Sequence, residues 1–567
     1  MKHTIKIFAT LALASLAFVS CEKQFDPQGS VVTARQAGDA PGSYDNFVNA
    51  ITSSLCGQFT YNGNSSTTPW DFGYPSFMLQ RDVMGQDIVC NSSGSEWYTT
   101  WYTSGVGLGP TYAVCQVPWT YYYGWIQSCN TVISMAGPEP DNQKIVGAGI
   151  AYAMRAFFYM DLARMFAPET YAVNPEAETV PIIDENTTPI SSTNNPRATN
   201  KDMWDFILSD LDKAEEYLEG YERADVYTPD QSVVYGLKAR AYLVMEDWAN
   251  AKLYAEKAME GYNMMSEDEY LSHTNGFNTP NSSWMFGCTF KSSDPNITLN
   301  DGDSSWGSQM VIEVSGSGMG YSANYVGPKC IDAHLYSTIP ATDFRRKLWI
   351  DPALDELDTQ AEIIEALKVY TDDPEGVYQT GYIVSEHEAV GYIPLKFRPK
   401  DGEHKDQYHA FTVAVPFMRV EEMKLIQAEA AGMINQADGI ALLTAFAKTR
   451  DASYVYGRHT DAYYNTSTGT FRNEIWWQRR IELWGEGQAT FDIKRLGKGI
   501  IRSYPGSNHP EDYQWNVESV PQWMHLCIVQ TETNYNKACT NNPTPVAPVG
   551  KSEEFTNWTD NSGSVDN

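Results

Sequence analysis

Cys21 is the residue of this chain whose position implies the most specific chemistry. It follows an apolar run, residues 8–19, which two lysines precede. A run of this length suits a signal peptide and is too short to cross a bilayer. The ending Ser20-Cys21 is typical of a bacterial lipobox, in which the cysteine becomes the first mature residue and is acylated on sulfur. We therefore predict a signal peptide over 1–20 and lipidation of Cys21, with an ordinary secretory signal as the alternative.

The remaining residues with metal or redox chemistry give weaker patterns. An even number of further cysteines in an exported chain permits disulfides, but the sequence does not determine their pairing. No C-x-x-C occurs and the nine histidines lack H-E-x-x-H spacing, so we expect no zinc site. Asn300, Asp301 and Asp303 could offer oxygen ligands to calcium, but without a full EF-hand loop a solvated turn is favoured. We predict no cofactor. The further cysteines are Cys56, Cys90, Cys115, Cys129, Cys288, Cys330, Cys527 and Cys539.

Composition limits the classes of partner. The chain has 567 residues, which by length alone suggests two to four domains, and a formal net charge of −31. Such a surface repels nucleic acid and anionic lipid head groups, so we expect no nucleic-acid partner and membrane contact through the lipid anchor only. Aromatic residues make up 13%, which is high for a cytosolic enzyme. Beyond the signal, no apolar run approaches the ~18 residues that cross a membrane.

Helical periodicity dominates the central part of the chain. Small alanines along 230–262 would let two helices approach closely, as in tetratricopeptide hairpins, and a second copy of this rhythm occurs at 419–447. The sequence therefore predicts a mainly α fold, in which three or four tetratricopeptide-like hairpins form a scaffold. Five stretches carry apolar residues at helical spacing: 121–135, 142–166, 200–218, 230–245 and 248–262.

Residues 263–415 have a different composition, rich in Gly, Ser, Asn and Asp, with short β-like runs at 309–314 and 391–397. We interpret them as a long loop-rich insertion that faces a ligand, since binding residues often lie on loops carried by a rigid scaffold. Residues 21–42 indicate a flexible tether after the lipidated cysteine, and 545–567 a disordered tail. The predicted single helical domain is thus 43–544.

The order of these segments resembles the SusD/RagB family of outer-membrane nutrient-binding lipoproteins. The motifs cover nearly the whole chain beyond the signal, in the order in which the family has them. Gln478 stands where the family usually has Glu, and Gln488-Ala489 replaces its usual His or Arg. The motifs are the lipobox at Cys21, the helix 119–130, Arg155-Ala156-Phe157-Phe158-Tyr159 with Val180-Pro181, the hairpin 239–258, 416–419 with Ala428-Glu429-Ala430, and 479–487 with 491–495.

The resemblance implies a fold, a location and a partner. It implies a non-catalytic lipoprotein, anchored to the outer membrane of a Gram-negative bacterium and exposed at the cell surface. Such a protein captures a glycan and delivers it to a SusC-like TonB-dependent β-barrel transporter. Two alternatives remain: a relative that captures peptides by the same lid mechanism, and a surface glycoside hydrolase. The hydrolase would need two carboxylates roughly 5–10 Å apart.

Sugar binding requires flat aromatic faces against the C–H faces of the rings and planar polar groups for the hydroxyls. Residues 81–101 and 284–325 combine both kinds of side chain, and family members carry their glycan site on equivalent loops. The alternative for each aromatic is a place in the core, because Trp97 and Trp101 are also spaced as a buried helix stripe. The candidate ligand residues are Trp97, Trp101, Trp306, Tyr321, Asn91 and Arg81.

Several charged residues lie within apolar helical stretches. Burying a charge is costly unless it is paired and hydrogen-bonded. We therefore expect these residues to form ion pairs that fix the register of the helices rather than to act in catalysis. They are Arg155, Arg419, Arg480, Glu482, Asp492 and Arg495.

Overall fold

The structure is a computed structural model that describes residues 42–57, 70–91, 97–103, 108–315, 320–383, 389–459, 469–546 and 548–556. Cys21, the signal peptide and the predicted tether before Gly42 lie outside these residues, as does most of the predicted tail. The predictions for those segments therefore stay predictions.

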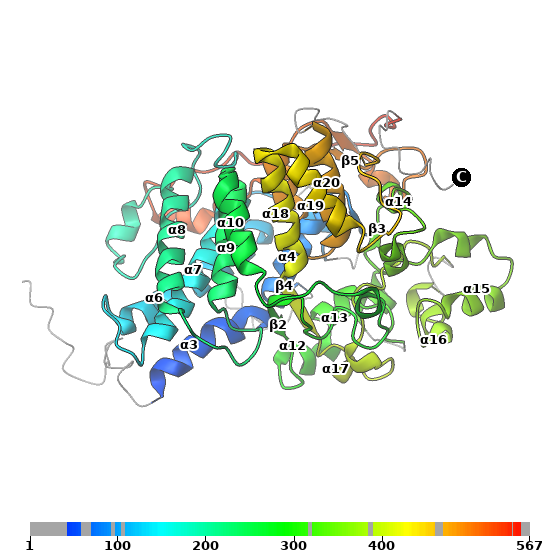
Figure 1. Ribbon diagram of the computed structural model, residues 1–567, viewed down its shortest axis with the longest axis horizontal. Coiled ribbons are helices and arrows are strands. Elements are labelled where there is room, and N and C mark those ends of the chain that lie inside the picture. The colour runs from blue at the N-terminus through cyan, green and yellow to red at the C-terminus, as the bar shows by residue number, and fades with distance from the viewer. Residues whose placement is uncertain are drawn as a thin grey trace, which may run out of the picture.

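A row of packed helices forms the scaffold (Figure 1). It begins with α6 (Ala113–Ala136), α7 (Ile145–Phe166), α8 (Asn200–Tyr217), α9 (Gln231–Met245) and α10 (Trp248–Ala258), each in contact with the next. Helix α10 then packs on α18 (Val420–Ile434), which contacts α19 (Gln436–Ala447) and α20 (Gly469–Glu482). The predicted mainly α fold with helical hairpins is confirmed.

The hairpins owe their tight turns to specific capping and small residues. Asp230 accepts a hydrogen bond from the Val233 amide at the start of α9, and Asp247 accepts one from Asn250 at the start of α10. In the α18–α19 hairpin, a Cβ atom on Gly439 would lie 2.2 Å from the Cα atom of Gly432. Glycine is therefore required where these two helices approach most closely.

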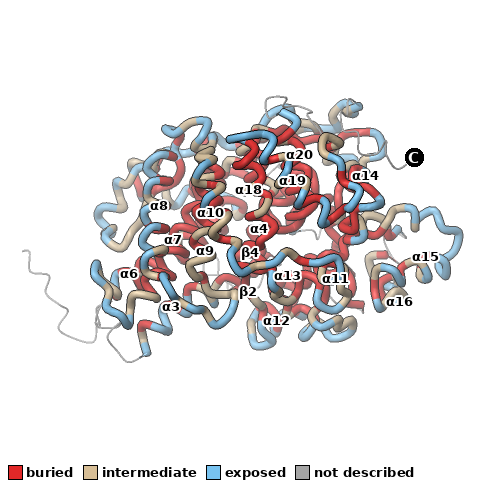
Figure 2. The backbone as a smooth tube through the Cα atoms, viewed as in Figure 1, coloured by how far each residue is buried: buried red, intermediate tan, exposed pale blue. Residues whose placement is uncertain are grey.

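Helix α7 corrects one expectation from the sequence. It is long and apolar enough to cross a membrane, which no segment beyond the signal was expected to be. However, 89% of its most apolar window is buried inside the protein. Its neighbours α6 and α8 cover it, so its apolar character serves the core (Figure 2).

Short strand pairs and short helices make up the rest of the fold, partly within the insertion. Strand β2 (Trp284–Thr289) pairs antiparallel with β4 (Ala414–Arg419), and β1 (Ile88–Val89) pairs with β3 (Cys330–Ile331). A third pair joins β5 (Ile500–Ile501) to β6 (Asn516–Val517). The remaining helices are α3 (Ser43–Ser53), α4 (Tyr74–Val83), α5 (Thr99–Tyr102), α11 (Glu267–Tyr270), α12 (Pro295–Thr298), α13 (Trp306–Met310), α14 (Ala333–Ser337), α15 (Gln360–Leu367), α16 (Pro374–Tyr378), α17 (Gln407–Ala410), α21 (Ala489–Leu496) and α22 (Gln530–Tyr535).

The two β-like runs predicted within the insertion are wrong as strands. Residues 309–314 continue from the end of α13 without forming a strand, and 391–397 contribute only an isolated bridge between Pro394 and Trp349. Residues 309–314 are all buried, as are 393–397. Their apolar character therefore reflects burial on all sides rather than the alternating pattern of a half-exposed strand.

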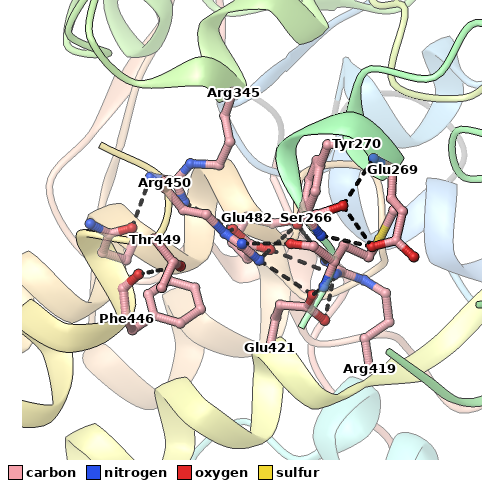
Figure 3. A network of polar contacts seen from close by, with 12 residues as sticks. Ser266, Glu269, Tyr270, Arg345, Arg419, Glu421, Phe446, Thr449, Arg450 and Glu482 are labelled. Atoms are coloured by element: carbon pink, nitrogen blue, oxygen red, sulfur yellow. Dashed lines mark hydrogen bonds and ion pairs between the residues drawn. The ribbon is translucent and has the colours of Figure 1, made fainter. Parts of the chain in front are cut away.

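A buried ion network joins the insertion to the last helices (Figure 3). Glu482 at the end of α20 receives hydrogen bonds from Arg345 (3.0 Å) and Arg450 (3.2 Å), and Tyr270 donates to it as well. Arg419 binds both oxygens of Glu486, at 2.8 and 2.9 Å.

The other predicted charges are also paired. Arg155 binds Asp210, Arg480 binds Asp87, and Asp492 lies between Arg479 and Arg495. The expectation of a structural role for these residues is confirmed.

Candidate functional site

An open pocket of about 440 Å³ lies at the edge where β1 pairs with β3. This edge lies near α14, toward one end of the helix row (Figure 1). Several of the lining residues offer ring faces, amides or a carboxylate to the space. The lining residues are Val89, Cys90, Asn91, Pro328, Cys330, Tyr382, Gly391, Tyr392, Asn508, Pro510 and Glu511.

Two tyrosines form aromatic walls of this pocket. Tyr392 has an unusual backbone conformation, and the ring of Tyr382 packs closely against a glycine. Tyr392 has φ of 66°, and its backbone bridges β3 and the segment at Ile350 through hydrogen bonds of 3.2 and 2.8 Å. A bulky residue in the left-handed region is strained and persists only where its surroundings impose it. The ring of Tyr382 lies against Gly327, where a Cβ atom would come within 2.0 Å of it. Gly327 is thus the residue that allows Tyr382 to reach the pocket.

A polar layer beneath the pocket fixes Asn508. Its side-chain oxygen accepts from the Ala333 amide at 2.9 Å, and its amide donates to the Ile331 carbonyl at 2.9 Å. Next to it, Nε2 of His509 lies 3.3 Å from Asp332, and Nδ1 lies 2.6 Å from the hydroxyl of Tyr102.

Burial affects the ionisation of His509 and Asp332 in this layer. Burial lowers the pKa of His509 below its ordinary value. Burial opposes ionisation of Asp332 too, yet its contacts with His509 and with the hydroxyl of Tyr504 lower the pKa of that carboxyl overall. The neutral imidazole of His509 is held on one side by the hydroxyl of Tyr102.

One of the six predicted ligand residues lines this pocket, and two others lie outside the core. Asn91 lines it directly. Tyr321 stands on the short helical turn Tyr321–Tyr325, where its ring lies 5.5 Å from that of Tyr325, and this turn contacts Gly381 next to Tyr382. Trp97 has 45% of its surface exposed. The residue that follows it, Tyr98, packs under the ammonium of Lys329, one residue before β3.

The structure places the other three in the interior. Arg81, Trp101 and Trp306 are 3%, 2% and 1% exposed. Arg81 donates to Asp161 at 3.1 Å and to the carbonyl of Gly487 at 3.0 Å. The ring of Trp101 packs on Tyr98 at 5.6 Å, and that of Trp306 packs on Phe397 at 5.0 Å. Side chains so enclosed offer no face to a dissolved ligand, and we assign them to the support of the fold.

Some pocket residues were not among the candidates. Tyr382, Tyr392, Asn508 and Glu511 all line it, and Tyr325 stands half exposed beside Tyr321. Gly381-Tyr382 and Gly391-Tyr392 repeat a Gly-Tyr pair in the sequence, but this repeat alone does not mark the two tyrosines as pocket residues. Asn508 and Glu511 come from a distant segment, and no local pattern marks them.

A second pocket, of about 580 Å³, is larger but chemically different. Tyr227 is the one aromatic side chain among its described lining residues, and the others are mostly hydroxyl, amide, carboxylate and thiol groups. The pocket at β1–β3 has two rings and lies near further exposed aromatics, so it fits a ligand with flat apolar faces better. In the described part of the chain, no group of three or more His, Cys, Asp or Glu could hold a metal ion.

The comparisons with known proteins agree with this architecture. Residues 78–243 match the family model described as starch-binding and associating with the outer membrane, and residues 369–550 match that of the SusD family. No curated protein matches the chain.

Solved structures of the same fold come from Bacteroides. A SusD-like carbohydrate-binding protein of Bacteroides vulgatus is 23% identical with a TM-score of 0.68, over 88% of this chain and 97% of its own. A SusD superfamily protein of Bacteroides thetaiotaomicron is 19% identical (TM-score 0.63; 88% and 99%). Surface glycan-binding protein A of the same species, in complex with laminarihexaose, is 16% identical (TM-score 0.62; 88% and 98%). With both family models matched in order and the fold shared across the chain, this protein is a member of the SusD/RagB family.

Proposed function

We propose that this protein is a non-catalytic glycan-binding lipoprotein of the outer-membrane surface, which captures an oligosaccharide and passes it to a TonB-dependent transporter. The observation that carries the proposal is the pocket at β1–β3. Its walls are tyrosine rings, and its polar groups are amides and one carboxylate. This is the combination that sugar rings require, because their C–H faces stack on aromatics while their hydroxyls bind planar polar groups. Family membership supports the same reading.

The pocket also argues against hydrolysis. A glycoside hydrolase needs two carboxylates flanking the scissile bond. Glu511 is the one carboxylate among the described residues that line this pocket. Asp332 lies beneath it, but Tyr504 and His509 engage that side chain and it is 2% exposed.

Trp97 and Tyr321, the two candidate aromatics outside the core, are expected to contribute to the affinity alongside the rings that line the pocket. Trp97→Ala and Tyr321→Ala should each weaken glycan binding by about 1–3 kcal/mol, roughly the contribution of one stacked ring by analogy with base stacking, and should leave the melting temperature unchanged. A saccharide array on the purified protein identifies the ligand, and calorimetry on the hits measures the loss.

Tyr535→Ala is the matched control, since Tyr535 is 49% exposed but lies on α22, where it donates to the Pro189 carbonyl. Its affinity should equal that of the wild type. Unchanged affinity in both Trp97→Ala and Tyr321→Ala would contradict the assignment of these two residues to the binding surface. Tight binding of peptides with no glycan hit, or release of reducing sugar, would contradict the function.

The membrane anchor is a separate expectation. Cys21→Ser removes the thiol that would carry the acyl chains. Two or three chains give durable anchoring, because each buried methylene contributes about 0.8 kcal/mol. The variant should therefore move from the membrane fraction to the soluble fraction of the cell, while its affinity for glycan stays the same. A variant that remains with the membrane would show that Cys21 is not the anchor.

A further inference from the structure

Two cysteines far apart in the sequence both line the larger pocket. Cys56 ends the short turn after α3, and Cys288 lies on β2, opposite Val415 of β4. The Cys56 thiol donates to the carbonyl of Thr289 at 3.1 Å, which brings its sulfur beside the neighbouring Cys288. Both cysteines line the same open pocket of about 580 Å³. Both residues carry free thiols in the structure; burial raises the pKa of Cys288, and the nearby Cys56 thiol raises it further.

A second such meeting occurs where the C-terminal segment returns to the start of α6. Cys115 stands in the first turn of α6 and donates to the Leu108 carbonyl at 3.4 Å. Cys527 lies on the C-terminal segment shortly before Gln530, whose amide donates to the Pro110 carbonyl at 3.0 Å. These contacts lay the segment along residues 108–115, and the nearby Cys527 thiol, together with burial, raises the pKa of Cys115 well above its ordinary value.

We propose that Cys56 pairs with Cys288, and Cys115 with Cys527, as two disulfides in the mature protein. The oxidising setting rests on the proposed export, but the pairing rests on the placement of the four sulfurs. The sequence leaves more than one hundred pairings of eight cysteines open. The fold brings these two pairs together from separations of roughly 230 and 410 residues, so each bond would restrict a very large loop of the unfolded chain.

The oxidation is an exchange with a donor disulfide, such as that of an exported thiol oxidase or of oxidised glutathione. One thiol of a pair loses its proton, its sulfur attacks the donor disulfide, and one donor thiolate leaves. The sulfur of the second thiol, once deprotonated, then attacks the mixed disulfide and expels the other donor thiolate. The protein forms one S–S bond, the donor is reduced to two thiols, and the two protons go to the donor sulfurs.

The surroundings of each pair suit this sequence. The open pocket gives a small donor disulfide access to Cys56 and Cys288. In the second pair, the nearby Cys115 thiol lowers the pKa of Cys527, so Cys527 is the sulfur that ionises more readily for the attack. Cys527 also lies within 3.8 Å of the carbonyls of Asn542 and Pro543, so those contacts position its side chain.

Mapping the cross-links on the full chain tests the proposal. The protein is incubated with oxidised glutathione or with a phosphine reductant, unfolded, alkylated with N-ethylmaleimide and digested without reduction. Mass spectrometry of the oxidised sample should find the two predicted cross-linked peptides, and the oxidised protein should melt at a higher temperature than the reduced protein. Cys56→Ala and Cys115→Ala should each remove one cross-link and part of the shift in melting temperature.

Cys129→Ala is the matched control, because Cys129 is fully buried on the same helix as Cys115. It should retain both cross-links. If Cys56→Ala does not fold, Cys288→Ala answers the same question from the other side. Alkylation of all eight thiols after oxidation, glutathione adducts without cross-links, or other pairings would each overturn the proposal. None of these readouts depends on glycan binding, so failure of the proposed function would be visible separately.

Discussion

Replacing Glu482 with glutamine is expected to lower the free energy of unfolding by about 3–5 kcal/mol, the usual cost of breaking a buried ion pair from one side. Glu482 is fully buried, and three arginines surround it: Arg345, Arg450 and, at 3.6 Å, Arg419. Burial opposes its ionisation, yet these guanidinium groups hold the pKa of Glu482 far below its ordinary value. Glutamine keeps the size of the side chain but removes the charge that all three arginines share.

Denaturation in guanidinium chloride measures this loss as a shift of the midpoint at constant slope. Glu365→Gln is the control, because its ion pair with Lys368 lies on the surface, where both side chains are more than half exposed. Surface ion pairs contribute little to the free energy of unfolding, so the denaturation midpoint of Glu365→Gln should match that of the wild type. A Glu482→Gln midpoint equal to that of the control would show that the network is not needed for stability.

The ion pairs that the structure shows around Glu482 illustrate what the sequence could predict about the core. Charged residues inside apolar helical stretches indicated ion pairs before any partner was known, because unpaired buried charge is too costly. The partners were not predictable. Arg480 pairs with Asp87, and Arg155 pairs with Asp210, from segments that only the tertiary fold brings together. The helices themselves were predictable for the same local reason, since their apolar spacing and their caps at Thr199, Asp230 and Asp247 are encoded nearby.

The candidate site was less accessible to sequence reasoning. Trp97 and Trp101 stand four residues apart, and the structure exposes one and buries the other. Composition could not separate them, because an aromatic ring suits a core and a sugar face equally well. What separates them is the position of α5: Trp101 lies within it and packs on Trp70 and Tyr98, whereas Trp97 precedes it. The other walls of the pocket come from separate segments whose convergence depends on long-range packing: Pro328 and Cys330, Tyr382, Gly391 and Tyr392, and Asn508, Pro510 and Glu511.

Acid is expected to destabilise the protein near this pocket through His334. His334 stands on α14 shortly after β3, where its backbone amide donates a hydrogen bond to the Tyr504 hydroxyl at 3.1 Å. Burial lowers the pKa of His334 to about 4; Asp332 opposes this shift and Arg480 adds to it. The folded protein therefore keeps the imidazole neutral at a pH where the unfolded chain, with an ordinary histidine pKa near 6.5, binds a proton.

The sign of the effect follows from this difference. The contribution to stability is fully present above about pH 6.5, and it is lost progressively as the pH falls through the folded pKa of about 4. The shift corresponds to about 3 kcal/mol for this one group. His334→Gln removes the titrating group, so its unfolding free energy should fall less between pH 6.5 and 4 than that of the wild type.

Chemical denaturation across this pH range measures the difference between the two proteins. His409→Gln is the control, since the side chain of His409 is about half exposed and lies on α17, away from the pocket. Its pH profile should follow that of the wild type. His525→Gln tests the same effect in a different part of the fold, because burial lowers the pKa of His525 to about 3. Parallel profiles for His334→Gln and the wild type would contradict the assignment. A flatter profile for His334→Gln, with glycan affinity at pH 5 retained better than in the wild type, would show that the neutral imidazole helps to hold the β3 wall of the pocket in place.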